Sequence, residues 1–221
     1  MKKNILIIGY GEIASRLSEI LDLSKYKVIG ISRNNKKNLD CHIRWDWLSD
    51  NSLSLEPETF DSIIFFPKPN SINENHYRDG FLKSSTNINN LLKTISYQKF
   101  ISISSTRVYG PSKKEIVSED DILIQNGFRT EIIQDYEKKQ LNYYQDKLII
   151  LRFAGLYDHK KPYNYKNSLS RNNAAKIIKF FVENDFKFKS SEIFNCCEDK
   201  LNLNKERNIS NNKLKKLGFN F

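Results

Sequence analysis

The chain has 221 residues, which is enough to bury the core of one domain. Its formal charge of +10 comes from 36 basic and 26 acidic residues spread along the chain, so a nucleic-acid partner is not expected. The apolar runs have strand length and are too short to span a membrane, and no cleavable leader follows the basic start. We therefore expect a cytoplasmic protein without a membrane partner.

Strand-like apolar runs alternate with helical patterns along the chain, which predicts βαβ units and a parallel sheet. The predicted strands are Asn4–Ile8, Lys27–Ile31, His42–Arg44, Asp61–Phe66, Lys99–Ser104, Lys147–Arg152 and Glu192–Asn195. The predicted helices are Glu12–Leu21, Tyr77–Ser96, Glu131–Tyr144 and Asn172–Asn184. This order indicates an α/β fold with a doubly wound parallel Rossmann sheet of six or seven strands, in a single domain over residues 1–221.

The first strand leads into a glycine-rich turn, Gly9-x-Gly11-x-x-Ala14, and then into an amphipathic helix. In this setting Gly9 permits the tight turn, Gly11 lets the backbone approach a pyrophosphate, and Ala14 allows close packing of helix on strand. Glu12 and Ile13 open the helix, whose N-terminus attracts phosphate groups. The turn predicts a dinucleotide site made of Gly9, Gly11, Glu12 and Ile13, and the alternative is a purely structural turn.

The end of the second predicted strand indicates which dinucleotide is bound. NAD-binding proteins usually carry an acidic residue there, but here the sequence reads Ser32-Arg33-Asn34 and the next carboxylate is Asp40. A hydroxyl and a guanidinium suit a 2′-phosphate, so Ser32 and Arg33 favour NADP, with NAD as the alternative. The three cysteines lack zinc-site spacing, and no metal is expected.

Two further motifs follow predicted strands. The stretch Ser104–Gly110 reads SSTRVYG, and Leu151–Tyr157 reads LRFAGLY. With the glycine-rich turn and the terminal SNNKL at Ser210–Leu214, they resemble motifs of the short-chain dehydrogenase/reductases. The resemblance is to the extended and atypical members grouped as NAD-dependent epimerase/dehydratase-like proteins, and it covers nearly the whole chain.

The resemblance implies roles for residues near the strand ends. Ser105 matches the hydroxyl that holds the substrate oxygen in active relatives, although it could instead cap the strand end. Thr106 and Arg107 would lie beside the substrate. Other residues would contact the dinucleotide: Asp46 near the adenine, unless it only caps a turn, and the backbone of Phe66 and Pro67 near the ribose and pyrophosphate.

The family's catalytic pair has the spacing Tyr-x-x-x-Lys, which Tyr143 and Lys147 share. Lys147 runs directly into the sixth predicted strand, so this pair is at the wrong end of its helix and is interpreted as coincidental. Tyr136 is the remaining candidate for a catalytic acid, but the residue four positions on is Gln140. If Glu137 matches the glutamate of relatives, the tyrosine position is Arg129, which could orient an anionic substrate.

These observations together predict an NADP-binding epimerase/dehydratase-like protein with a non-standard active site. Its substrate would be a nucleotide-linked sugar or a small carbonyl compound, under a small cover built from residues 110–128 and 158–221. The alternative is a catalytically silent dinucleotide-binding protein, such as a redox sensor or partner subunit. A homodimer is an open alternative to a monomer.

Overall fold

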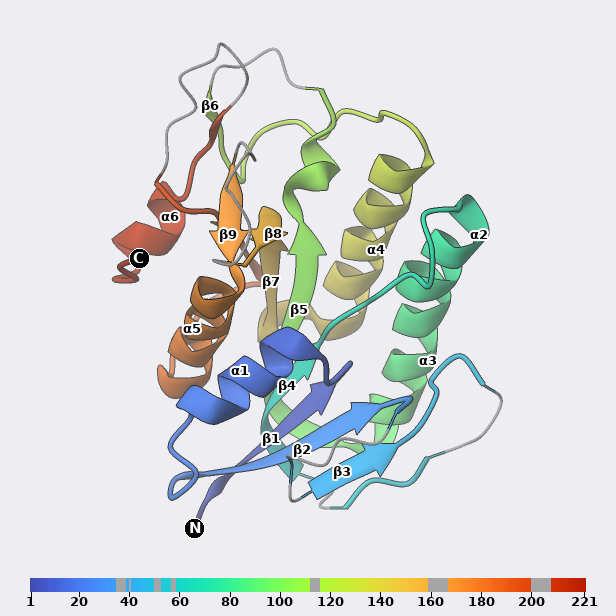
Figure 1. Ribbon diagram of the computed structural model, residues 1–221, viewed down its shortest axis with the longest axis vertical. Helices are drawn as coiled ribbons and strands as arrows, with labels where there is room; N and C mark the ends of the chain where they lie inside the picture. The colour runs from blue at the N-terminus through green and yellow to red at the C-terminus, as the bar shows by residue number, and fades with distance from the viewer. Residues whose placement is uncertain are drawn as a thin grey trace.

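The computed structural model describes residues 1–34, 39, 41–49, 53–56, 59–111, 116–158, 167–199 and 208–221. Within them, a seven-stranded sheet has the order β10-β7-β5-β4-β1-β2-β3, and each neighbouring pair is parallel (Figure 1). Its strands are β1 (Lys3–Ile8), β2 (Tyr26–Ser32), β3 (Cys41–Arg44), β4 (Thr59–Phe65), β5 (Ser96–Ser105), β7 (Leu148–Phe153) and β10 (Glu192–Cys196). The expected doubly wound α/β fold is confirmed.

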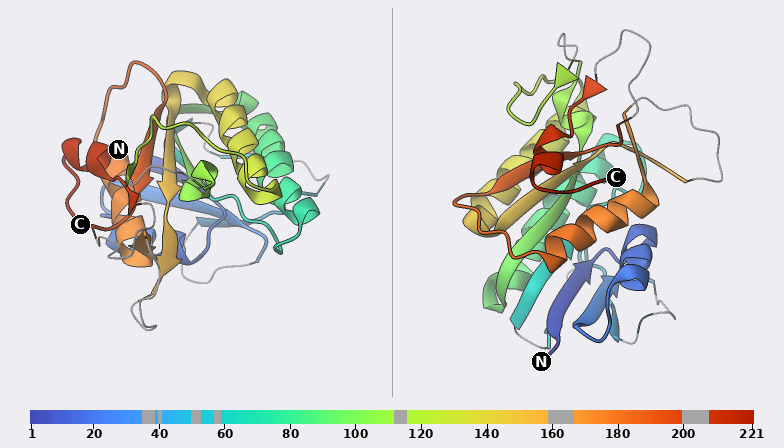
Figure 2. Two further views of the ribbon diagram at one scale, coloured as in Figure 1. Left: turned by 90° about the horizontal axis from the view of Figure 1, so that it is seen from above. Right: turned by 90° about the vertical axis from the view of Figure 1, so that its left-hand side faces the viewer.

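Helices cover both faces of this sheet. The described helices are α1 (Glu12–Ile20), α2 (Glu74–Tyr77), the π-helical η1 (Arg78–Lys83), α3 (Ser84–Leu91), η2 (Leu92–Thr94), η3 (Thr106–Tyr109), α4 (Phe128–Tyr144), η4 (Gln145–Lys147), α5 (Arg171–Glu183) and α6 (Asn212–Lys216). In Figure 2, α1 and α5 lie on one face, and α3 and α4 lie on the other. Both faces of the central strands are therefore covered by helices, as their apolar sequences require.

The burial of the strands explains their composition. The four isoleucine and leucine residues from Ile5 to Ile8 have no exposed surface, and every residue of β7 is buried. On the adjoining helix, Ala14 and Leu17 face the sheet and are buried. A small residue at position 14 lets α1 approach the strands closely, as the glycine-rich pattern predicted.

Several element boundaries differ from the sequence-based expectations. The single helix expected over Tyr77–Ser96 begins at Glu74 and is interrupted by the π-helical η1. There Gly80 packs so closely on the loop after β4 that a Cβ atom would lie 2.5 Å from Pro69. Helix α4 begins three residues earlier than expected, at Phe128.

Two short parallel ladders were not expected at all. They join β6 (Ile116–Val117) to β11 (Asn208–Ile209), and β8 (Gly155–Tyr157) to β9 (Ser168–Ser170). In each ladder, a short strand that follows β5 or β7 in the chain pairs with a strand from further along the sequence. Parts of the two cover segments, together with Asp40, lie outside the described residues.

The strand order places a crevice where the sheet reverses its direction of winding. The chain proceeds outward from β1 through β2 to β3, and then crosses back to β4 on the other side of β1. At such a switch point the loops after neighbouring strands separate, and ligands of doubly wound sheets bind at the carboxyl ends of the strands there. The turn after β1 and the loop after β4 meet at this point.

Candidate functional site

The turn after β1 has the geometry of an anion site. Gly9 has a φ of 91°, and a Cβ atom there would lie 2.6 Å from the carbonyl oxygen of Phe66, so only glycine fits. Gly11 is the N-cap of α1, and no side chain caps this helix. A Cβ atom on Gly11 would meet no described atom closer than 3.8 Å. The first amides of α1 thus face open space, where a phosphate fits.

A pocket of about 510 Å³ opens directly over this turn. Its lining includes every residue expected to bind the dinucleotide except Asp46, namely Gly9, Gly11, Glu12, Ile13, Ser32, Arg33, Phe66 and Pro67. The other described lining residues are Tyr10, Ala14, Asn34, Trp47, Lys68, Ile103, Phe153, Leu156 and Arg171. The structure therefore brings the glycine-rich turn and the end of β2 to one cavity.

Ser32 and Arg33 line this pocket, and both already have partners. The Ser32 hydroxyl donates to the carbonyl oxygen of Asn34 at 2.8 Å and also contacts Nε2 of His42 at 2.8 Å. A guanidinium nitrogen of Arg33 donates to Oδ1 of Asn70 at 2.6 Å. This bond links the loop after β2 to the loop after β4.

Asp46 has a local role in the structure. Its carboxylate accepts the amide hydrogen of Leu48 at 3.0 Å, and its carbonyl oxygen accepts the Ser49 hydroxyl at 2.6 Å. These bonds form a turn after β3, which matches the capping alternative considered for this residue. The neighbouring Trp47, which sequence reasoning did not select, lines the pocket instead.

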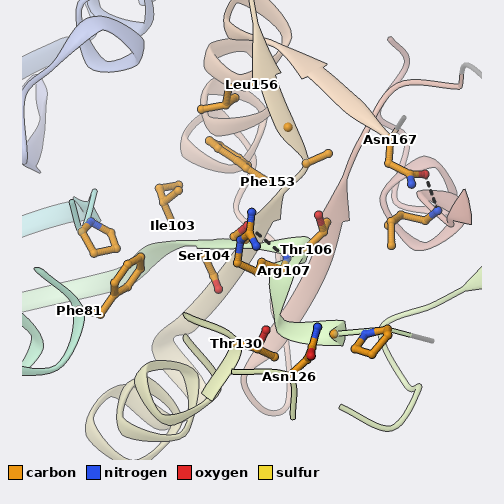
Figure 3. Close-up of a pocket in the computed structure, with 17 residues that line it drawn as sticks. Phe81, Ile103, Ser104, Thr106, Arg107, Asn126, Thr130, Phe153, Leu156 and Asn167 are labelled. Carbon is orange, nitrogen blue, oxygen red and sulfur yellow. Dashed lines mark hydrogen bonds between the residues drawn. The ribbon is translucent and has the colours of Figure 1, made fainter. Parts of the chain in front are cut away.

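A second, larger pocket of about 870 Å³ lies beyond the carboxyl ends of β5 and β7 (Figure 3). The described polar residues of its lining are Ser104, Ser105, Thr106, Arg107, Asn126, Thr130 and Asn167. The Ser105 hydroxyl accepts the amide hydrogen of Arg107 at 3.2 Å and thereby caps η3. The hydroxyl can still donate, so capping and contact with a ligand are compatible.

The two pockets adjoin one another. Pro67, Ile103, Phe153 and Leu156 line both, so these four side chains form the boundary between the cavities. A long ligand could bind with one end over the glycine-rich turn and its other end beside Ser105. Among the described residues, no group of three or more histidine, cysteine or acidic side chains could hold a metal ion.

Tyr136 is not placed to act in either pocket. The side chain has no exposed surface, and its hydroxyl bonds to the Ser102 hydroxyl at 2.6 Å inside the core. Burial raises the pKa of this phenol far above its ordinary value, which makes it a poor proton donor or acceptor at neutral pH. The rotation of α4 turns this position toward Phe65 and Phe81. The expectation that Tyr136 could be catalytic is therefore corrected.

The other positions considered on α4 also lie away from the pockets. Tyr143 is in the last turn of α4, and the exposed Lys147 precedes β7, so both lie near the amino ends of the strands. Arg129 stacks its guanidinium over Tyr77 and Phe128, at 5.9 and 5.7 Å from the ring centroids, and is absent from the described lining of the larger pocket. That lining contains neither a tyrosine nor a lysine.

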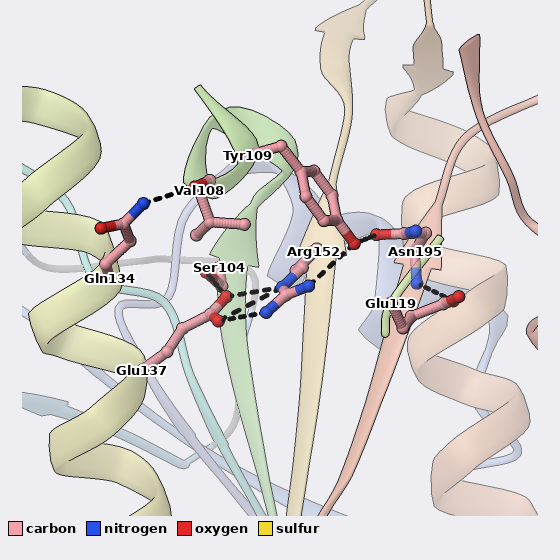
Figure 4. A network of polar contacts seen from close by, with 8 residues as sticks. All are labelled: Ser104, Val108, Tyr109, Glu119, Gln134, Glu137, Arg152 and Asn195. Atoms are coloured by element: carbon pink, nitrogen blue, oxygen red, sulfur yellow. Dashed lines mark hydrogen bonds and ion pairs between the residues drawn. The ribbon is translucent and has the colours of Figure 1, made fainter. Parts of the chain in front are cut away.

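A buried polar network supports the wall of the larger pocket (Figure 4). Glu137 on α4 accepts hydrogen bonds from Nε and Nη2 of Arg152 on β7, at 3.0 and 2.7 Å. It also accepts the Ser104 hydroxyl at 2.6 Å. Arg152 donates to the Tyr109 hydroxyl at 2.8 Å, which in turn donates to Asn195 at 2.8 Å. The network ties α4, β5, η3, β7 and β10 together beneath the pocket.

Burial and charge act in opposite directions on this network. Burial by itself would lower the pKa of Arg152, but the charge and hydrogen bonds of Glu137 outweigh it, and the pKa of the guanidinium is raised. Burial raises the pKa of Tyr109 to about 12 despite the neighbouring cation. Arg152 is therefore charged and Tyr109 neutral at physiological pH.

Sequence reasoning missed several lining residues, most of them distant in the chain from the motifs. Lys68 and Arg171 add cations to the smaller pocket, and Asn126, Thr130 and Asn167 add polar groups to the larger one. Two of them had a local signal: Lys68 directly follows the predicted Pro67, and Arg171 immediately precedes the helix predicted over Asn172–Asn184. Loop residues such as Asn126 carry no periodic pattern that could have marked them.

Comparisons with known proteins agree with this architecture. No protein-family model and no curated protein matches the chain. Among solved structures, a protein assigned as an NAD-dependent epimerase/dehydratase from Methylobacillus flagellatus has a TM-score of 0.74 at 16% identity, covering 100% of this chain and 93% of its own. A protein assigned as an epimerase from Burkholderia cenocepacia J2315 has a TM-score of 0.75 at 12% identity, with coverages of 97% and 91%.

The third example carries a named activity and a bound cofactor. It is the UDP-glucuronic acid 4-epimerase from Bacillus cereus, solved in complex with NAD, with a TM-score of 0.71 at 19% identity. The alignment covers 89% of this chain and 78% of that protein. The chain has the fold of the NAD-dependent epimerases and dehydratases. At these identities the likeness establishes the epimerase/dehydratase fold and not the activity.

Within this epimerase/dehydratase fold, the described residues show one more feature. None of their helices combines the length and the apolar composition that crossing a bilayer requires. Helices α1 and α5 instead bury one face in the core and leave the other partly exposed.

Proposed function

We propose that this protein binds NAD(P), with NADP favoured, and acts on a nucleotide-linked sugar or a small carbonyl compound through a non-standard active site. The observation that carries this proposal is the pair of adjoining pockets at the carboxyl edge of the sheet. One lies over the glycine-rich turn, and the other contains Ser105. The epimerase/dehydratase fold, and the NAD bound to the Bacillus cereus neighbour, support a dinucleotide as the ligand.

The chain's own residues fit such a ligand. The uncapped amides at the start of α1 would hold the pyrophosphate, and the absence of a side chain on Gly11 leaves room for it. Arg33 and Lys68 would contact a 2′-phosphate on the adenine ribose, because they are cations on the rim of the same pocket. A bound nicotinamide would supply or accept a hydride at the boundary between the two pockets.

In the larger pocket, Ser105 and Thr106 would hydrogen-bond the substrate, and Arg107 would pair with its anionic group. The Arg107 side chain is exposed, lines the pocket, and makes no ion pair with any described residue. We assign residues 110–128 and 158–221 as the substrate cover of a single domain over residues 1–221. Pro111, Asn126, Asn167 and Ile209, which line the larger pocket, come from these segments.

The second candidate function is a catalytically silent dinucleotide-binding protein. It is favoured by one observation: the described lining of the larger pocket lacks a tyrosine and a lysine, while Tyr136 is enclosed in the core. Among the described lining residues of this pocket there is no histidine, lysine or carboxylate that could take the proton of Ser105. The two candidates share the dinucleotide site and differ only in turnover.

The test is calorimetric titration of NADPH and NADH into wild type, Arg33→Ala and Gly11→Ala. Arg33→Ala should weaken NADPH binding by about tenfold or more while leaving NADH unchanged, because charge-assisted hydrogen bonds are worth about 1.5–3 kcal/mol. Gly11→Ala should remain folded, since its methyl group has room, and should weaken both ligands. Lys27→Ala, which removes an exposed cation from the other end of β2, is the matched control.

If wild type binds neither NADPH nor NADH, the proposal is overturned. If binding is present, turnover of NADPH with nucleotide-sugar and carbonyl substrates separates the two functions. Loss of turnover in Ser105→Ala with unchanged NADPH affinity supports the enzyme. Binding without turnover of any tested substrate supports the silent protein.

A further inference from the structure

Two arginines share one carboxylate at the start of α1. Glu12, the first residue of this helix, accepts a hydrogen bond from Arg16 at 2.7 Å through one oxygen, and pairs with Nε of Arg171 at 3.1 Å through the other. Arg171 is the first residue of α5, which packs against α1 (Figure 1). Only Arg171 of these two cations lines the smaller pocket.

The contact between Arg171 and Glu12 is easily exchanged. Their side chains are 29% and 55% exposed, so water screens the pair and its net contribution is small. The planar guanidinium carries five N–H donors, and in the described part of the chain only Nε of Arg171 pairs with a carboxylate. The terminal nitrogens remain available for the paired contacts that phosphate oxygens accept.

Release of Arg171 would not leave Glu12 without a partner. Arg16 stays at 2.7 Å from its carboxylate, and is itself fixed by Asp158 at 2.7 Å and by Asn172 at 2.5 Å. The carboxylate can therefore remain paired while Arg171 turns toward a ligand. A carboxylate at this helix terminus also occupies the same positive field that a pyrophosphate would enter, so the two anions oppose one another.

We propose that Arg171 is a pyrophosphate-binding residue and that Glu12 is its internal counter-ion, which competes with the ligand for it. This assignment rests on the proposed dinucleotide site and adds to it a cation from a helix more than 150 residues away in sequence. Ligand binding exchanges the Glu12 contact of Arg171 for contacts with phosphate oxygens. No bond other than hydrogen bonds and ion pairs changes in this exchange.

The assignment makes opposite predictions for the two partners. Arg171→Ala should weaken binding of NADPH and of ADP-ribose by about tenfold, because both ligands carry the pyrophosphate and a charge-assisted contact is lost. Glu12→Gln should tighten binding of both ligands, by about threefold, since it removes the competing charge while keeping the side chain's shape. A cation that only added to the general field of the protein would not give this pair of effects.

Lys176→Ala is the matched control, because Lys176 is an exposed cation on the same helix and lies outside the described pocket lining. Affinities come from calorimetry on the full chain, and circular dichroism checks that each variant is folded. Arg171→Lys should recover part of the affinity, which separates charge from packing.

Three outcomes are decisive. Weakening in Arg171→Ala, tightening in Glu12→Gln and no change in Lys176→Ala support the assignment. If Arg171→Ala binds NADPH as tightly as wild type, or if Lys176→Ala loses as much affinity as Arg171→Ala, the assignment is overturned. The proposed dinucleotide site is not affected by either result. If wild type binds neither NADPH nor NADH, the proposed function itself is overturned, and this assignment is overturned with it.

Discussion

Replacement of Glu137 by glutamine tests the buried network beneath the larger pocket. The substitution keeps the shape of the side chain but removes the negative charge opposite Arg152. Both side chains of this pair are only 3% exposed, so water cannot replace the lost partner. The amide would also direct an N–H group toward the Arg152 guanidinium or the Ser104 hydroxyl, which now donate to the carboxylate.

The expected loss of stability is large. Removing one partner of a buried ion pair costs about 3–5 kcal/mol, because the remaining charge stays buried without compensation. A domain of this kind is stable by only about 5–15 kcal/mol. Glu137→Gln should therefore remain folded in buffer but should unfold at a markedly lower urea concentration than wild type.

The assay is equilibrium urea unfolding, followed by circular dichroism and by the fluorescence of Trp45 and Trp47. Glu74→Gln is the control, because Glu74 pairs with Arg78 on the surface, where the two side chains are 48% and 54% exposed. That substitution should change the free energy of unfolding by less than about 0.5 kcal/mol.

A double-mutant cycle with Arg152→Met measures the pair itself. The double variant should be more stable than the sum of the single losses predicts, by about 2–3 kcal/mol, because it leaves no unpaired charge in the core. A loss below about 1 kcal/mol in Glu137→Gln would refute the reasoning, since it would mean that the Arg152 charge finds solvent or another partner.

Two further predictions concern buried tyrosines. Tyr144→Phe should raise the free energy of unfolding by about 1 kcal/mol, because the Tyr144 hydroxyl is buried without a hydrogen-bond partner. The substitution keeps the ring, whose centroid lies 3.7 Å from that of Phe100. An unchanged or lower midpoint of urea unfolding would contradict this prediction. Stability should also fall as the pH rises from about 10 to 12. Tyrosines of the unfolded chain ionise near pH 10, whereas burial raises the pKa of Tyr109 to about 12, so the unfolded chain gives up protons first in this window. Urea unfolding at pH 8 and pH 11 measures the difference, and equal midpoints would count against it.

Local sequence patterns predicted the features that depend on neighbouring residues. The apolar run from Asn4 to Ile8 predicted a strand, and the spacing of Gly9, Gly11 and Ala14 predicted the turn that follows it. Both were found, since backbone conformation and burial are set there by adjacent side chains. The seven parallel strands followed in turn from the alternation of such segments.

The interior of the site was decided by contacts between distant segments. Successive residues of a helix point about 100° apart, so which of them enters the pocket depends on how the helix packs, and Tyr136 lies in the core beside Ser102. The sequence could not reveal that Asn70 holds Arg33, or that Asp46 serves a turn.

The sequence by itself thus determined the sheet, the glycine-rich turn and the side of the sheet on which a ligand site would form. Only the tertiary structure decided which charges meet there. Glu12 and Arg171 are 159 residues apart, and Glu137 pairs with Arg152 across a helix and a strand. Such pairs depend on how α5 packs on α1 and how α4 packs on the sheet, and packing of this kind leaves no local pattern in the chain.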